Sequence, residues 1–314
     1  MTTQKDAREI PTDKQSSIVV QDASGTISDF PDQVDLVHVN ATADVGFDTL
    51  DLRAAYVVRR VYISTVNSND ARLDVFLPNL PDDGSINNVP SIHVSPLNKT
   101  ASRKWGEFGS KVHIINPTDF LHTLTVERAR VKVHNVTMLG WLQADRETRL
   151  DIEDLERITE FKGAEDPDLP VGTYQITGGY TFPNLKTIGT LIAPSPALTS
   201  ISSPQFSITN ILDMGPGWGH GDNYREPKFL GGILTIGKNL SIHDMRGVDF
   251  SFNELKSVGD NIEIHGIEYC SFKFGKLTKL GHLTMYDFKK SVMPGDFLRL
   301  EDALSIHLNG IIDT

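Results

Sequence analysis

The sequence predicts a mainly β protein with an N-terminal antiparallel β-sandwich or jelly roll, a short linker helix and a C-terminal repeat β-solenoid. Alternating β-branched segments over residues 35–142, an acidic stretch over 143–170 and an internal repeat over 171–314 lead to these predictions. Residues 1–34 are polar and lack apolar periodicity, so we expect an extended N-terminal arm that either becomes ordered on a partner or has no role. A chain of 314 residues is long enough for two separate cores.

The sandwich prediction rests on strand-length segments with period-two alternation. In Arg130–His134, two valines fall on one face while arginine, lysine and histidine fall on the other, as in a strand with one solvated side. Loops rich in Pro, Asn and Asp separate these segments at the spacing typical of an all-β sandwich. The expected strands are residues 37–39, 56–63, 73–77, 91–94, 111–115, 124–126 and 129–136.

The helix prediction rests on the acidic stretch, which holds ten acidic residues against four basic ones. Ile152, Leu155 and Ile158 recur at three-residue spacing, and Thr148 stands three residues before Asp151 as in a capping box. This pattern predicts a short amphipathic helix between two domains. Its charge is typical of a solvated face.

The solenoid prediction rests on a recurring pair, an isoleucine followed by a histidine. Ile242, Ile264 and Ile306 open these pairs, and Met285 opens a Met-Tyr pair in the one gap, so that the four pairs follow one another at a nearly constant interval. A wider Phe-x-x-Leu-x-x-apolar-Gly phrase also recurs, beginning at Phe182, Phe252 and Phe274. A period of about 22 residues with apolar side chains at fixed offsets predicts stacked coils that bury their hydrophobic edges against one another.

Stacking these phrases in register predicts two outward columns, because alternate strand residues face opposite sides. Glycines before each strand are expected to adopt positive φ. The first column is Ser241, Glu263, Thr284 and Ser305; the second is His243, His265, Tyr286 and His307; the glycines are Gly189, Gly237, Gly259 and Gly281. The histidine column is either a recognition strip whose charge changes at about pH 6 to 7, or a set of outward polar residues that stack on one another on a solvated sheet.

Residues 194–232 interrupt the repeat with a glycine-rich loop. Within it, Trp218 and Tyr224 are candidate contact residues, because exposed aromatic side chains favour sugar stacking and protein contacts. His220 and Asp222 are further binding candidates; as a lone His-x-Asp pair they indicate a polar loop rather than a metal site. Alternatively, the loop packs over the edge of the solenoid and protects it.

The composition argues against several functional classes. A net charge of −11 disfavours binding to nucleic acid or an anionic membrane, and no apolar run of about 18 residues or secretory leader is present. Cys270 is the only cysteine, so no intrachain disulfide or cysteine metal site can form. No catalytic motif appears, and we predict a non-enzyme without metal or cofactor. Glu263, Asp244 and Asp287 leave glycoside hydrolysis open.

The Leu-Lys-x-Ile-Gly phrase at residues 185–189, which leads toward Leu-x-Ile strands in later coils, resembles leucine-rich repeats of the receptor-L-domain type. The resemblance covers residues 180–314 but lacks the buried asparagine ladder, so a parallel β-helix is the neighbouring possibility. The resemblance implies a sheet face that binds proteins or glycans.

The segments 73–78, 91–94 and 111–115 are similar to a phrase of bacteriophage head-fibre, decoration and tail-fibre domains. This resemblance implies a homo-oligomeric virion structural protein, assembled in the host cytoplasm, that decorates the capsid or forms part of a head or tail fibre. The arm and sandwich would contact other virion proteins, and the solenoid a host surface glycan or protein. The alternatives are a polysaccharide-degrading tailspike and a cellular interaction scaffold.

Overall fold

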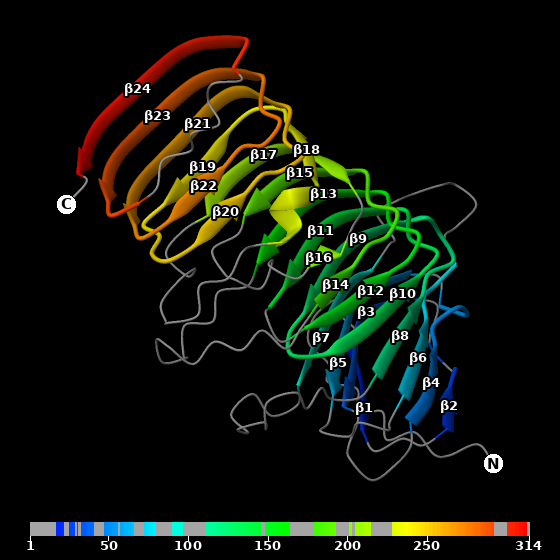
Figure 1. Ribbon diagram of the computed structural model, residues 1–314. Helices are drawn as coiled ribbons and strands as arrows, with labels where there is room; N and C mark the ends of the chain where they lie inside the picture. The colour runs from blue at the N-terminus through cyan, green and yellow to red at the C-terminus, as the bar shows by residue number, and fades with distance from the viewer. Residues whose placement is uncertain are drawn as a thin grey trace. The chain divides into compact units, whose positions relative to one another are not determined.

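The chain folds as a β-solenoid of stacked parallel coils, which the computed structural model shows in Figure 1. It divides into two compact units, an N-terminal unit Met1–Leu155 and a C-terminal unit Glu156–Thr314. Both units are built from parallel strands. The structure describes residues 17–21, 25–28, 30, 33–40, 47–55, 57–65, 72–79, 90–96, 111–145, 148–163, 179–192, 201–202, 205–214, 228–291 and 300–312.

In the N-terminal unit the chain alternates between two parallel sheets, so that each coil adds one strand to each sheet. The first sheet contains β1 (Ser17–Gln21), β3 (Gln33–Asn40), β5 (Val57–Thr65), β7 (Ser91–Pro96), β9 (Phe120–Val126) and β11 (Met138–Ala144). The second sheet contains β2 (Gly25–Ile27), β4 (Phe47–Asp51), β6 (Arg72–Phe76), β8 (Lys111–Ile115), β10 (Arg130–His134) and β12 (Arg149–Ile152).

The antiparallel sandwich prediction is therefore wrong, although many of the expected strands exist. Period-two alternation identifies a strand but not its partner or direction, and every strand pair among the described residues of this unit is parallel. Unequal coil lengths also hid the repeat: Arg72 pairs with Lys111 and Lys111 pairs with Arg130, so the first of these two coils is much longer than the second. The expected arm also contains solenoid strands, β1 and β2; residues 1–16 lie outside the described residues.

The linker-helix prediction is wrong as well. The acidic stretch contains β12 and β13 (Arg157–Gly163). Ile152, Leu155 and Ile158 are all buried. Their three-residue spacing matches that of a helix face because a two-residue turn lies between the two strands. Thr148 is buried and donates through Oγ1 to the carbonyl of Val126 at 3.1 Å, so it joins neighbouring coils instead of capping a helix.

In the C-terminal unit the first sheet is longer and the second is short. The first sheet contains β13, β15 (Thr187–Ile192), β17 (Phe206–Met214), β18 (Ile233–Ile236), β19 (Leu240–His243), β21 (Ser257–Glu268), β23 (Lys279–Lys289) and β24 (Asp302–Ile312). The remaining elements are β14 (Gly179–Thr181) with β16 (Ile201–Ser202), β20 (Asp249–Ser251) with β22 (Ser271–Lys273), and the 3-10 helix η3 (Lys228–Gly232). Within the described ranges, no helix combines the length and apolar character needed to cross a membrane.

The interior of the C-terminal unit is built from like residues stacked on one another. The rings of Phe250 and Phe272 lie 4.8 Å apart at 7°, and those of Phe252 and Phe274 lie 5.2 Å apart at 10°. All four side chains are buried, so the recurring Phe-x-x-Leu phrase encodes the core. Offset aromatic stacking adds to the free energy gained from removing these rings from water.

The recurring glycine has a different purpose from the one expected. Gly189, Gly237, Gly259 and Gly281 do not have positive φ; among the described glycines only Gly247 and Gly266 do. Instead, a Cβ on Gly281 would overlap the carbonyl oxygen of Asp260 in the preceding coil. Close approach between coils, not turn conformation, therefore requires glycine there.

Candidate functional site

Three ring side chains of the predicted histidine column stack on the outer face of the C-terminal unit. Parallel pairing aligns His243 with His265 and His265 with Tyr286. The His243 and His265 ring centroids lie 5.4 Å apart at 13°, and those of His265 and Tyr286 lie 4.7 Å apart at 7°. We call this His243–His265–Tyr286 stack the ring ladder.

The neighbouring predicted column also forms in its first three coils, where Ser241, Glu263 and Thr284 are aligned. In the fourth coil both column assignments are wrong. His307 pairs with Thr284, Ser305 pairs with His282, and the partner of Tyr286 is Asn309. The reason is a longer last coil, because the chain takes more residues to pass from Tyr286 to Asn309 than from His265 to Tyr286.

A sharp corner follows every residue of the ring ladder and fixes its position. Asp244, Gly266 and Asp287 have φ values of 51°, 62° and 54°, in the left-handed region. The backbone N–H of Asp244 donates to the carbonyl of His265 at 3.0 Å, and its carboxylate lies 3.1 Å from His243 Nδ1. Each ring is therefore followed directly by a residue with positive φ, which bends the extended backbone at the same place in three coils.

The ring ladder presents ring edges to solvent, because its faces cover one another. Tyr286 Oη lies 3.5 Å from Glu263 Oε1 and donates to it. Partial desolvation, reinforced by the Glu263 carboxylate, raises the pKa of Tyr286, so its hydroxyl remains a donor at neutral pH. The ladder thus offers imidazole nitrogens and a phenol oxygen at the step of about 4.8 Å between parallel strands.

A second ring column on the first sheet of the N-terminal unit was missed from the sequence. His38, Tyr62 and His93 are aligned by parallel pairing. The centroids of His38 and Tyr62 lie 6.2 Å apart at 65°, and those of Tyr62 and His93 lie 5.2 Å apart at 28°. Each ring is the centre of an apolar-ring-apolar triplet, but the unequal spacing of the three triplets along the chain concealed the pattern.

The second sheet of the N-terminal unit carries charged columns on its outer face. Pairing aligns the basic residues Arg72, Lys111, Arg130 and Arg149 in one column and Asp74, His113, Lys132 and Asp151 in the next. Ion pairs offset the repulsion between like charges: Arg72 contacts Asp74 at 2.7 Å, and Lys132 contacts Glu153 at 2.6 Å. Burial, and next the Arg72 cation, lowers the pKa of His113, which favours the neutral imidazole at pH 7.

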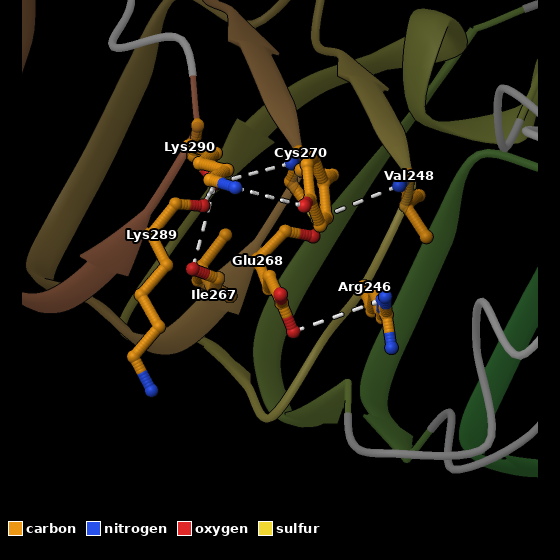
Figure 2. A network of polar contacts seen from close by, with 9 residues as sticks. Arg246, Val248, Ile267, Glu268, Cys270, Lys289 and Lys290 are labelled. Atoms are coloured by element: carbon orange, nitrogen blue, oxygen red, sulfur yellow. Dashed lines mark hydrogen bonds and ion pairs between the residues drawn. The ribbon is translucent and has the colours of Figure 1, made fainter. Parts of the chain in front are cut away.

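Cys270 lies at a buried corner of the C-terminal unit (Figure 2). Its Sγ accepts the N–H of Val248 at 3.4 Å, and its own N–H donates to Ser291 Oγ at 3.1 Å. Burial raises the pKa of the thiol to about 11, so the thiolate required of a nucleophile is scarce at neutral pH. The contacts of Figure 2 hold neighbouring coils together at this corner.

Other predicted groups are not assembled into a centre. In the part of the chain that the structure describes, no three His, Cys, Asp or Glu side chains are arranged to hold a metal ion. Asp244, Glu263 and Asp287 are all exposed around the ring ladder. Trp218, His220, Asp222 and Tyr224 lie outside the described residues.

The ring ladder is the most regular group of predicted site residues that the described structure brings together. No protein-family model, curated protein or solved structure matches this chain. A functional proposal therefore rests on the geometry of the ring ladder.

Proposed function

We propose that the chain is a non-enzymatic structural and attachment protein that binds a surface polysaccharide along the ring ladder. The observation that carries this proposal is the in-register stack of His243, His265 and Tyr286. Parallel pairing repeats the ring edges at one fixed step, and a polymer with regularly spaced hydroxyls can meet each edge in turn.

The surroundings of the ring ladder favour a neutral polysaccharide over an acidic one. Glu263 lies beside the ladder, and Asp244 and Asp287 follow its rings, all exposed. An anionic ligand would meet these carboxylates at short range, whereas neutral hydroxyls can donate to them. An imidazole nitrogen can donate or accept a hydrogen bond, and a hydroxyl group can do either, so the two groups can pair.

The proposed setting is a bacteriophage virion, in which the chain decorates the capsid or forms part of a head or tail fibre. A solenoid of parallel coils supports this setting because its backbone is hydrogen-bonded from coil to coil and can display a repeated surface without a catalytic centre. The N-terminal unit would contact other virion proteins, while the ring ladder contacts the host. Many copies on one particle would convert weak individual contacts into firm attachment.

Calorimetric measurement of binding to purified neutral bacterial surface polysaccharides tests the proposed ligand class. The triple variant His243→Ala, His265→Ala, Tyr286→Ala should lose most of the binding, because all three ring edges are removed. A matched control replaces His38, Tyr62 and His93, the ring column of the N-terminal unit, and should retain it. Equal loss in both variants, or unchanged binding by the triple variant, would contradict the proposal.

Two further measurements test the remaining parts. Incubation of the protein with the polysaccharide that it binds should release no oligosaccharides. Release would favour the tailspike alternative and contradict the non-enzymatic assignment. Mass spectrometry of purified particles should find the chain together with capsid or tail proteins. Its consistent absence from particles of the producing phage would contradict the virion setting.

A further inference from the structure

The last described strand of the C-terminal unit, β24, exposes three large apolar side chains. Leu304, Ile306 and Leu308 are 74, 47 and 50 % exposed, the largest values among the large apolar side chains described. Ile306 pairs with Leu283 and Leu308 pairs with Met285, and both partners are fully buried. Ile306 and Leu308 therefore occupy core positions of the solenoid that no further coil covers among the described residues.

The backbone of the same strand offers a free edge. Within the described residues β24 pairs with β23 and with no other strand, and Figure 1 shows it outermost in its sheet. It spans 11 residues, Asp302–Ile312. A long edge with apolar side chains is a template for pairing with another chain, and repeat proteins ordinarily cover such ends.

We propose that a second copy of this chain binds here, with the two β24 strands paired antiparallel about a two-fold axis through Ile306. This register places Ile306 opposite its own copy and Leu304 opposite Leu308, so all three exposed apolar residues meet apolar partners. Asp302 then faces Gly310, and Ser305 faces His307, so no carboxylate opposes another. Moving the axis to Leu304 would set Asp302 against Ile306.

The symmetry preserves the inside and the outside of the sheet. A two-fold axis along the sheet normal reverses the strand direction but leaves each inward side chain pointing inward. The apolar interior of one copy then continues into that of the other, and the backbone edge becomes hydrogen-bonded.

A head-to-tail arrangement, with β24 of one copy against β1 of the next, fits less well. Strand β1 has five residues, which would leave half of the β24 edge unpaired. Such a contact would also be heterologous and would propagate into a filament unless it closed into a ring. Strand length therefore favours the closed pair.

Light scattering over a wide range of protein concentration tests the pair. The native chain should be a dimer, and Ile306→Lys a monomer with an unchanged far-ultraviolet circular dichroism spectrum, because two lysines would face each other at the axis. Met138→Lys alters a side chain of the N-terminal unit that is 37 % exposed, and this control should remain a dimer. A native monomer at all concentrations, or a dimeric Ile306→Lys variant, would overturn the inference.

Disulfide formation tests the register. Directly opposed residues of antiparallel strands have Cα atoms about 4.5 to 5.5 Å apart, within the range that a disulfide can bridge. Ile306→Cys should therefore form an intermolecular disulfide under mild oxidation, while Ala303→Cys, whose opposite residue would be Asn309, should not. A filament held by β24 and β1 would instead leave Cys-substituted chains uncrosslinked. This inference stands on β24 and does not depend on the ligand of the ring ladder.

Discussion

The two ring columns of this solenoid have like composition but unlike order. In the C-terminal unit, the ladder rings are separated by coils of nearly equal length and lie within 13° of parallel. In the N-terminal unit, the coil from Tyr62 to His93 is longer than the coil from His38 to Tyr62, and the ring angles are 65° and 28°. The comparison associates uniform coil length with flat stacking. Pairing alone brings side chains into a column, but it does not orient them.

The largest expected effect concerns the interior stacks that accompany the uniform coils. Phe274→Ala should destabilise the C-terminal unit by about 3 to 5 kcal/mol, because the substitution removes a fully buried ring and leaves a cavity against Phe252. Urea unfolding followed by circular dichroism measures the change. Ile114→Val, in the less uniform N-terminal unit, should cost about 0.5 to 1.5 kcal/mol. A cost for Phe274→Ala no greater than that of Ile114→Val would contradict the assignment of the stacked rings to the core of the C-terminal unit.

The next effect concerns the close approach between coils. Gly281→Ala should destabilise by about 1 to 3 kcal/mol, because the new Cβ overlaps the Asp260 carbonyl oxygen and forces the backbone apart. Thermal unfolding measures it. Gly231→Ala is the matched control, since the nearest atom to its added Cβ is the Asn253 side-chain nitrogen at 3.8 Å. Similar melting temperatures for the two variants would show that coil spacing is easily relaxed.

A smaller effect concerns pH and the charged columns of the N-terminal unit. Burial lowers the pKa of His113 below its ordinary value of 6.5, so the unfolded chain takes up the proton first as pH falls. Stability is thus lost progressively from about pH 6.5 down through the lower pKa of the folded state. His113→Gln should flatten the dependence of unfolding free energy on pH in this window. An unchanged slope, measured by urea titrations at several pH values, would remove His113 as the cause.

The smallest expected effect is an absence of reaction at Cys270. Its thiol is buried with a pKa raised to about 11, so a thiol reagent at pH 8 should not label the native chain but should label it fully in urea. Because Cys270 is the only cysteine and lies in the C-terminal unit, the labelling rate reports the opening of that unit alone. Rapid labelling in native buffer would show that the corner of Figure 2 opens readily.

The sequence was sufficient to predict strands and the C-terminal repeat, because both depend on local periodicity. Ile242, Ile264 and Met285 are buried as expected, and the rings that follow them form one column. Strand direction was not predictable in the N-terminal unit, since side-chain alternation is the same in parallel and antiparallel strands. Loops of unequal length then concealed the alignment of His38, Tyr62 and His93.

Two other predictions failed because one pattern has two physical origins. The spacing of Ile152, Leu155 and Ile158 arises from a tight turn between strands as readily as from a helix. Likewise, a repeated glycine marks either a backbone position with positive φ or a close contact that leaves no room for a Cβ. Only the position of the neighbouring coil distinguishes the two. The misplacement of His307 came from the greater length of one coil, which a repeated Leu-Ser-Ile-His phrase disguised.

The corner after each ring of the ladder has a consequence for how such a surface can grow. Asp244, Gly266 and Asp287 have positive φ directly after the ring in three successive coils, so the backbone changes direction at the same place in each coil. Duplication of one such coil would therefore insert without disturbing its neighbours and would lengthen the ladder by one ring, at a step of about 4.8 Å. The number of coils therefore sets the length of the ladder.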